Sequence, residues 1–359
     1  MEFLRKIRLA TPLGLAVALL SAPPAMLTAQ DVAVPVVQQL PAATSSADGF
    51  LGYLQLVGAK ARGEGVSQRA IDSITYGLTY NPRVVSLDRA QPGSTPGSPP
   101  AFWSYYNRHI GAERINLGRA ALADNAGLVS QAETQYGVPR KMIIAIWGKE
   151  TFYGRIKGDF DLARSLATLA YEGRRRDLFE GELIALMKMA DRGVPRSRML
   201  GSWAGAFGNP QFLPSVYLRV ARDGDGDGDA DIWNSRADTF ASIANYFKDA
   251  GWRPGEPWGV RASSPDSLDR RLLTNRLESP SCPAVHNRHS VWKTVGEWRA
   301  LGVVPQAPIA DSTMAVLFEP DGVGNGAFLL TGNYRVILQY NCSNYYALSV
   351  GLLADEISR

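Results

Sequence analysis

The sequence has few of the residues that most often carry nucleophilic or metal chemistry. Its 359 residues include only two cysteines, Cys282 and Cys342, and three histidines. His286 and His289 lie near Cys282, but Pro283 and basic neighbours indicate a loop rather than a metal site. The sequence also lacks a phosphate-binding loop, a dinucleotide-binding fingerprint and a Gly-x-Ser-x-Gly turn. These absences argue against nucleotide-dependent enzymes and α/β-hydrolases.

Long apolar runs are scarce as well. The apolar run at 13–20 is too short for a transmembrane helix. Basic residues precede it and the small-residue stretch 27–29 follows it, which is the order typical of a secretory signal peptide. We therefore expect residues 1–29 to be a signal peptide. Since no later stretch is long and apolar enough to span a bilayer, we expect an exported, soluble chain.

The sequence has no large excess of positive or of negative charge. The 38 Lys and Arg and 34 Asp and Glu residues give a net charge of +4. Without residues 1–29, 35 basic and 33 acidic residues leave +2. This near-neutral balance argues against bulk nucleic-acid binding. In an oxidising compartment Cys282 and Cys342 predict one disulfide, and two buried free thiols are the alternative.

Helical patterns dominate the chain. Residues 30–49 are rich in Ala, Val, Pro and Gln and are interpreted as a flexible lead-in, and 91–100 (QPGSTPGSPP) as a loop. Apolar periodicity predicts helices within 50–80 and over the following segments: 120–135, 139–153, 161–171, 180–193, up to Gly251, and 345–357.

Strand-like patterns appear only late, in 314–319, 327–332 and 334–340. The pairs Asp321-Gly322 and Gly332-Asn333 bound them, as in antiparallel hairpins. The fold class expected is α+β, predominantly helical, with a small antiparallel sheet near the C-terminus.

The most informative residue is Glu150, in the stretch GVPRKMIIAIWGKETFYG (137–154). Pro139 suits the first turn of a helix, and Gly154 suits its end. Glu150 follows Ile146 by four residues and Trp147 by three, so the three share one helix face. Burial on such a face raises the pKa of a carboxyl, as a general acid for glycosidic cleavage requires. The alternative is a surface glutamate beside Lys149.

A second segment, GSWAGAFGNPQFLPSVY (201–217), combines small residues with two polar ones, Ser202 and Gln211. Its glycines allow close approach of a ligand or of a neighbouring backbone. Phe207 and Phe212 offer apolar faces on which sugar rings could lie. Tight helix packing and a helix cap at Ser202 are the structural alternatives.

Four blocks in order resemble the MltB family of lytic murein transglycosylases, which are periplasmic and have a lysozyme-like fold. The blocks are AIWGKETFYG (145–154), RSLATLAYEGRRRDLFEGEL (164–183), GSWAGAFGNPQFLP (201–214) with DGDGDADIWNSRADTFASIANYF (225–247), and YNCSNYYALSVGLL (340–353). The resemblance implies one catalytic domain over 50–359. Its lysozyme-like core would span about 101–260, and 285–355 would complete the cleft.

The resemblance also implies roles for individual residues. Glu150 matches the single catalytic acid/base of the family. The matching cleft residues are Ser202, Gln211, Tyr246, Tyr340, Asn341, Tyr346 and, more weakly, Tyr105. Arg174 and Arg175 match an arginine pair that faces the saccharide or its peptide. A solvated charge run is the alternative for the arginines, and a helix would point them in different directions.

The stretch DGDGDGDADIWN (223–234) has the spacing of a calcium-binding loop. Asp223, Asp225 and Asp227 fall at positions 1, 3 and 5, but Asn234 replaces the usual glutamate at position 12. Some members of the resembled family bind calcium through a longer loop, which Asp238 could close. A structural calcium ion or an ion-free Asp/Gly turn are the two interpretations, and no cofactor is required.

The resemblance supplies a reaction. Glu150 would protonate the β-1,4 bond between N-acetylmuramic acid and N-acetylglucosamine, then deprotonate the C6 hydroxyl that closes a 1,6-anhydro ring. A lysozyme-like hydrolase and a non-catalytic peptidoglycan-binding protein are the alternatives. Glycan strands are the expected partner. Proteins of cell-wall synthesis or division are further candidate partners, but the sequence does not specify which.

Overall fold

Helices make up most of the computed structural model, which describes residues 47–91, 101–277, 279 and 281–359. The expected signal peptide, the lead-in up to residue 46 and residues 92–100 of the expected loop lie outside this part of the chain. Within the described residues, no helix is both long and apolar enough to cross a membrane.

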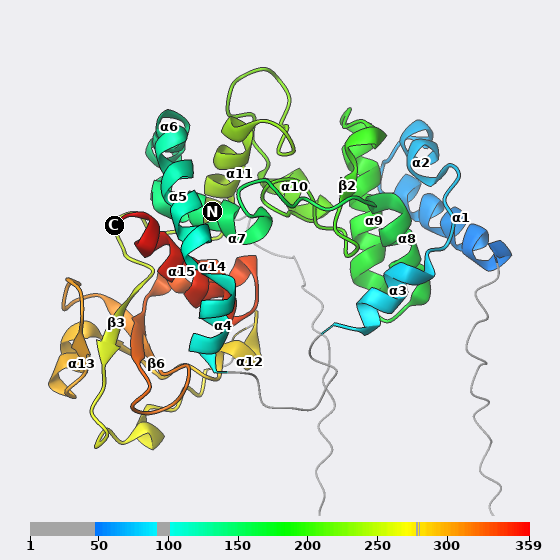
Figure 1. Ribbon diagram of the computed structural model, residues 1–359. Helices are drawn as coiled ribbons and strands as arrows, with labels where there is room; N and C mark the ends of the chain where they lie inside the picture. Colours follow the sequence, from blue (N-terminus) through cyan, green and yellow to red (C-terminus); the bar gives the residue numbers. More distant parts are fainter. Residues whose placement is uncertain (1–46, 92–100, 278, 280) are drawn as a thin grey trace, which may run out of the picture. The chain divides into compact units, whose positions relative to one another are not determined.

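One group of helices surrounds α9 (Figure 1). Short polar side chains set where these helices begin: Ser67 accepts a hydrogen bond from the Ala70 N–H, and Asp161 from the Arg164 N–H. The group comprises α1 (Ala47–Gly63), α2 (Gln68–Thr75), α3 (Pro82–Arg89), α8 (Leu162–Glu172) and α9 (Arg176–Asp191).

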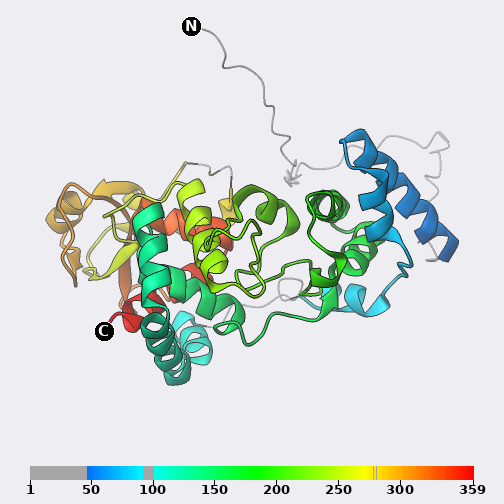
Figure 2. The ribbon, with the colours of Figure 1, turned by 90° about the horizontal axis from the view of Figure 1, so that it is seen from above.

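A second group surrounds α7 (Arg140–Thr151), whose residues 142–148 are all buried. The apolar run expected to form a core face is therefore confirmed. Helix α7 contacts α5, α6, α11 and α15, and Figures 1 and 2 show α15 beside α5 and α7. The other members are α4 (Phe102–His109), α5 (Ala112–Asp124), α6 (Ala126–Tyr136), α10 (Pro214–Val220), α11 (Arg236–Asp249), α12 (Pro283–His286), α14 (Gly332–Tyr340) and α15 (Asn344–Ile357).

The segment between α9 and α11 joins the two groups, because α10 contacts both helices. It also contains the 3-10 turn η1 (Arg196–Arg198) and a two-stranded ribbon, in which β1 (Phe160–Asp161) pairs with β2 (Leu200–Gly201). This segment includes 201–217, where the sequence analysis places cleft residues.

The sheet has five antiparallel strands in the order β4-β6-β7-β3-β5. In the register, Val316 faces Leu330 and Leu317 faces Leu329. Leu317 and Leu329 pack with Trp298 in a small separate core, whereas Val316 and Leu330 pack against the main core. The elements are β3 (Gly259–Ser263), η2 (Arg270–Leu273), β4 (Trp292–Thr294), α13 (Val295–Ala300), β5 (Val304–Pro305), β6 (Met314–Phe318) and β7 (Ala327–Leu330).

The prediction of a strand at 334–340 is wrong, because these residues form α14. The Thr331 side chain accepts the Asn333 N–H and starts the helix where a hairpin turn was expected. Tyr334, Ile337 and Leu338 are buried at helical spacing, so packing outweighs the strand preference of the aliphatic run. The strands at 314–319 and 327–332 are confirmed as neighbours, although β7 ends at Leu330.

Two predicted helices differ in their bounds. The pattern at 120–135 is divided at Asn125, which ends α5 and begins α6. The helix expected at 139–153 ends at Thr151, since Phe152 adopts a left-handed conformation. The fold class is confirmed: the chain is mostly helical with a small antiparallel sheet.

Candidate active site

Glu150 lies in the last turn of α7, just before an unusual change of chain direction. Phe152 and Tyr153 have φ angles of 51° and 60°, values that non-glycine residues rarely adopt. The Thr151 hydroxyl accepts the Gly154 N–H at 3.1 Å and donates to the Asn209 carbonyl at 3.1 Å. The helix thus ends three residues before the glycine that the sequence analysis chose, and the strained turn is held by contacts on both sides.

Asn209 is the residue that ties α7 to the 201–217 segment. Its Oδ1 accepts the Trp147 indole N–H at 3.0 Å, and its Nδ2 donates to the Ile232 and Trp233 carbonyls at 3.2 Å. All of these groups are buried. Sequence reasoning missed Asn209, because a lone Asn in a Gly-rich segment looks like a turn residue.

The Glu150 carboxyl has one direct hydrogen-bond donor among the described residues, the Tyr346 hydroxyl on α15. Burial raises the pKa of Glu150 from the ordinary 4.5 to about 7, while the Tyr346 hydrogen bond and the charges of Lys149 and Arg114 oppose the rise. Near neutral pH this carboxyl can therefore give up a proton and take one back.

Three of the expected cleft tyrosines lie together. Tyr340 stacks on Tyr346 with ring centres 6.5 Å apart, and Tyr246 lies 4.6 Å from Tyr340. Burial raises the pKa of Tyr346 and Tyr340 well above the usual range, with the Glu150 charge adding to it. These tyrosines are therefore neutral donors. The Tyr340 hydroxyl donates to the Pro210 carbonyl at 2.5 Å, which brings α14 to the 201–217 segment.

Ser202 and Gln211 shape the loop at 201–214. The Ser202 hydroxyl accepts the Ala206 N–H at 3.0 Å, so Ser202 is not a helix cap. Gln211 has a φ of 51°, and its amide donates to the Gly208 and Lys157 carbonyls. Both bonds are donated by the Gln211 side-chain nitrogen.

Phe207 and Phe212 do not form the sugar platforms that the sequence analysis considered. Their exposed fractions are 0% and 2%, and Phe207 stacks on Trp233 with ring centres 5.0 Å apart. Both rings belong to the core beneath the loop.

Tyr105, on α4, lies beside Lys149. Its hydroxyl accepts a hydrogen bond from Lys149 Nζ at 3.2 Å. Burial, with the Arg114 charge adding to it, lowers the pKa of Lys149 from 10.5 to about 8, and Glu150 opposes the change. Tyr105, the weaker match in the family resemblance, thus lies next to Glu150, together with two cations, Lys149 and Arg114, that were not among the expected site residues.

Among the described residues, no contact joins Asn341 to Glu150, and the same holds for Ser202 and Gln211. Asn341 ends α14, and its side chain is exposed. The next residue, Cys342, forms a disulfide with Cys282. This bond fastens the turn between α14 and α15, the helix that carries Tyr346.

Arg174 and Arg175 converge on Asp88, which is 1% exposed. Burial alone would raise the pKa of Asp88, but hydrogen bonds from both arginines outweigh it and hold the pKa below its usual value. Arg174 and Arg175 lie in the turn before α9, with Arg175 as its N-cap residue, so they are not on a helix that would point them in different directions. Their observed contacts join α3 to the α8–α9 connection.

The acidic loop contains a compact carboxylate cluster. Oxygens of Asp223, Asp225 and Asp227, all exposed, lie within 4.8 Å of one another. Such hard oxygen donors fit calcium. The Asp238 carboxylate instead accepts the Gly224 N–H at 2.7 Å and the Asp231 N–H at 2.6 Å. Asp238 therefore stabilises the base of the loop and does not belong to the cluster.

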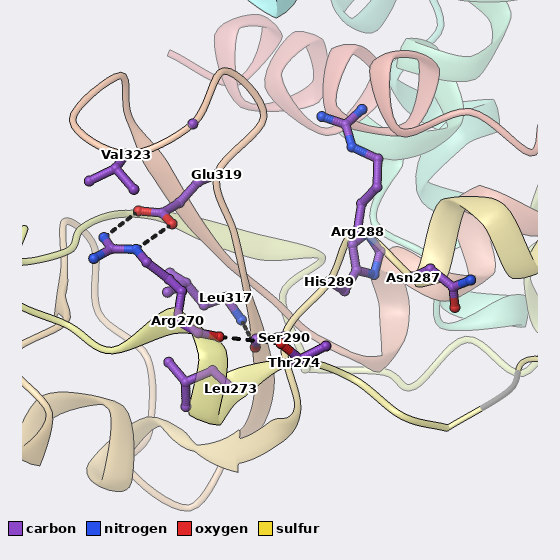
Figure 3. A pocket seen from close by; sticks show the side chains of 11 residues that line it. Arg270, Leu273, Thr274, Asn287, Arg288, His289, Ser290, Leu317, Glu319 and Val323 are labelled. Carbon is purple, nitrogen blue, oxygen red and sulfur yellow. Dashed lines mark hydrogen bonds and ion pairs between the residues drawn. The ribbon is translucent and has the colours of Figure 1, made fainter.

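A separate pocket of about 330 Å³ lies beside the sheet (Figure 3). There the Arg270 guanidinium donates to both oxygens of Glu319, at 3.0 and 2.8 Å. The ion pair lowers the pKa of Glu319. A carboxylate held ionised in this way is unsuited to act as a general acid near neutral pH.

Comparison with known proteins gives a consistent result. A family model described as the transglycosylase SLT domain matches residues 49–355. Membrane-bound lytic murein transglycosylase B of Escherichia coli is 31% identical over 268 residues, which is 73% of this chain and 69% of the relative.

Solved structures agree with this match. SltB3 of Pseudomonas aeruginosa in complex with NAG-anhNAM-pentapeptide is 37% identical, with a TM-score of 0.76 over 86% of this chain and 79% of that one. The Escherichia coli lytic transglycosylase Slt35 in complex with calcium is 27% identical, with a TM-score of 0.70 over 85% and 92%. The chain therefore belongs to the MltB family of lytic murein transglycosylases.

Proposed function

We propose that this lytic transglycosylase cleaves the β-1,4 bond between N-acetylmuramic acid and N-acetylglucosamine, with Glu150 as its single acid and base. The observation that carries the proposal is a half-buried carboxyl whose pKa is raised to about 7 and which accepts the Tyr346 hydroxyl. The structure of SltB3 with an anhydro-muropeptide supports the choice of product class.

In the first step protonated Glu150 gives its proton to the glycosidic oxygen as the bond to C1 breaks. The N-acetyl carbonyl of the muramoyl sugar assists, a route known for glycosidases that lack a second carboxylate. In the second step the Glu150 carboxylate takes the proton from the C6 hydroxyl, whose oxygen bonds to C1 as the bond between C1 and the N-acetyl oxygen breaks. The carboxyl regains its starting state, and no water is consumed.

The contacts of other carboxylates support a single-acid mechanism. Glu172 at the end of α8 is bound by Arg89 at 2.8 Å, and hydrogen bonds from Arg89 and the Arg174 N–H keep its pKa low despite burial. Buried Glu182 accepts the Ser215 N–H at 2.9 Å at the start of α10. Both side chains are committed to structural contacts.

The test is digestion of purified sacculi, with mass spectrometry of the soluble products. Wild type should release 1,6-anhydromuropeptides, and Glu150→Gln should release none. The control is Glu133→Gln, which removes a half-exposed carboxyl on α6, 3.8 Å from Arg140. Reducing-end products from wild type would indicate a hydrolase instead. Binding of sacculi with no release by wild type would indicate a non-catalytic binding protein.

We propose further that Asp223, Asp225 and Asp227 hold a calcium ion with a structural role. The compact oxygen cluster and the calcium complex of Slt35 support this. A bound ion would offset the repulsion among three carboxylates and fix the loop that precedes Ile232 and Trp233, the carbonyl partners of Asn209. Calcium should raise the unfolding temperature of wild type but not of Asp225→Asn, measured by calorimetry against magnesium as a control.

The proposed substrate lies outside the cytoplasm, so we propose export to the periplasm through residues 1–29. Fractionation of cells that express the tagged full chain would test this, with a variant lacking residues 1–29 as control. Recovery of the full chain only from the cytoplasm would contradict it.

A further inference from the structure

Lys149 lies in the last turn of α7, but its side chain is not exposed as that of a surface lysine would be. Its side chain is half-buried and reaches toward α4 and α15. The ammonium donates to the Tyr105 hydroxyl at 3.2 Å and lies 5.0 Å from the centre of the Tyr105 ring and 5.8 Å from that of Tyr346. Two aromatic rings, one of which bears the hydroxyl bound to Glu150, thus fix this cation beside the acid.

Among the residues that the structure describes, none forms an ion pair with Lys149. An ammonium has three N–H donors, and the described residues accept only one of them, at Tyr105. Arg114, from α5, adds a second positive charge, and it too has no carboxylate partner in the described part of the chain. It donates to the Gly148 carbonyl and lies over the Phe152 ring. Partly buried cations usually have a paired anion, so this arrangement indicates a functional demand for positive charge.

The charged and titratable groups around Lys149 come from four elements. Helix α4 gives Tyr105 and, stacked on that ring, His109; α5 gives Arg114; α7 gives Glu150; and α15 gives Tyr346. Of these side chains Glu150 is the one that becomes an anion near neutral pH. The attraction between Lys149 and Glu150 therefore exists only after Glu150 has lost its proton.

This dependence makes the cation useful in catalysis. Before cleavage Glu150 is protonated, and Lys149 gains little from it. As the proton moves to the glycosidic oxygen, the developing carboxylate is stabilised by a charge that is already in place. An interaction that grows toward the transition state raises the rate, whereas one that is equal in both states does not.

We propose that Lys149 is a positioning residue of the acid–base, whose fixed positive charge sets how readily Glu150 releases its proton. The proposal rests on the proposed role of Glu150. It differs from a purely structural role, in which Lys149 would only pack against Tyr105 and Tyr346.

The experiment compares wild type with Lys149→Met and Lys149→Arg. The pH dependence of kcat/KM is measured on soluble glycan strands, and the Glu150 carboxyl is titrated by NMR with ¹³C-labelled glutamate, assigned with Glu150→Gln. Loss of the Lys149 charge should raise the pKa of Glu150. The alkaline limb of the kcat/KM profile should then move to higher pH by about half a pH unit or more. Below the limb, kcat/KM should fall about threefold. Lys149→Arg should keep the wild-type limb.

Lys188→Met is the matched control, because Lys188 on α9 is half-buried like Lys149 but pairs with Glu64 at 2.8 Å. An unchanged limb and an unchanged Glu150 titration in Lys149→Met would overturn the proposal, even if activity fell. The NMR titration still decides if that variant is folded but inactive, and Lys149→Gln replaces it if it does not fold. Full activity in Glu150→Gln would instead refute the proposed function itself.

Discussion

Replacing Glu150 by Gln should stabilise the protein at neutral pH. In the folded state burial raises the pKa of this carboxyl from 4.5 to about 7. Below pH 4.5 the group is protonated in both the folded and the unfolded chain, so the stability that comes from its raised pKa is fully present. As the pH rises through the folded pKa, the unfolded chain is ionised and gains solvation, and the free energy of unfolding falls.

The magnitude follows from the shift. At 1.36 kcal/mol per pKa unit, the shift corresponds to about 3 kcal/mol of stability lost between about pH 4.5 and pH 7. Gln has nearly the same shape, and its side-chain oxygen can still accept the Tyr346 hydroxyl. Glu150→Gln should therefore match wild type near pH 4.5 and exceed its free energy of unfolding by up to about 3 kcal/mol at pH 8.

Urea denaturation at a series of pH values, followed by far-ultraviolet circular dichroism, measures this difference directly. Glu133→Gln serves as the control, because it makes the same substitution in a half-exposed carboxyl on another helix. If the difference between Glu150→Gln and wild type were the same at pH 4.5 and pH 8, the raised pKa would be refuted.

Three further outcomes are expected. Tyr346→Phe removes a charge-assisted hydrogen bond worth about 1.5–3 kcal/mol, so the alkaline limb of kcat/KM should move up by about one pH unit; an unmoved limb would show that this bond does not act on Glu150. Asn209→Ala leaves buried partners unsatisfied and should lower the free energy of unfolding by about 2–4 kcal/mol in urea titrations, and a stable, fully active variant would contradict its tying role. Asp88→Asn removes the buried charge that Arg174 and Arg175 share and should lower the free energy of unfolding by about 2 kcal/mol. Glycan release per folded molecule should be preserved. Loss of release at unchanged stability would instead assign the two arginines to substrate binding.

Local patterns predicted much of the scaffold. The apolar run before Glu150 is buried as a helix interior, because periodicity and burial agree there. At 334–340 they disagree: Val336 and Ile337 favour a strand on propensity, but the Thr331 cap and the packing of Tyr334 decide for a helix.

The candidate site could not be predicted from local patterns, because it depends on contacts between residues far apart in the sequence. Tyr346 lies 196 residues from Glu150, so periodicity could not pair them, and only the family resemblance brought both into one site. Two other sets of contacts could be predicted neither from local patterns nor from the resemblance. The arginine pair binds an aspartate 86 and 87 residues away, and Lys149 matters through rings on two other helices.

The most direct test of the central claim is to follow the Glu150 carboxyl by NMR over the same pH range as kcat/KM. We expect the carboxyl to titrate near pH 7, with activity falling along the same curve as the proton is lost. A Glu150 fully ionised at about pH 5 in an enzyme still active at pH 7 would contradict the account.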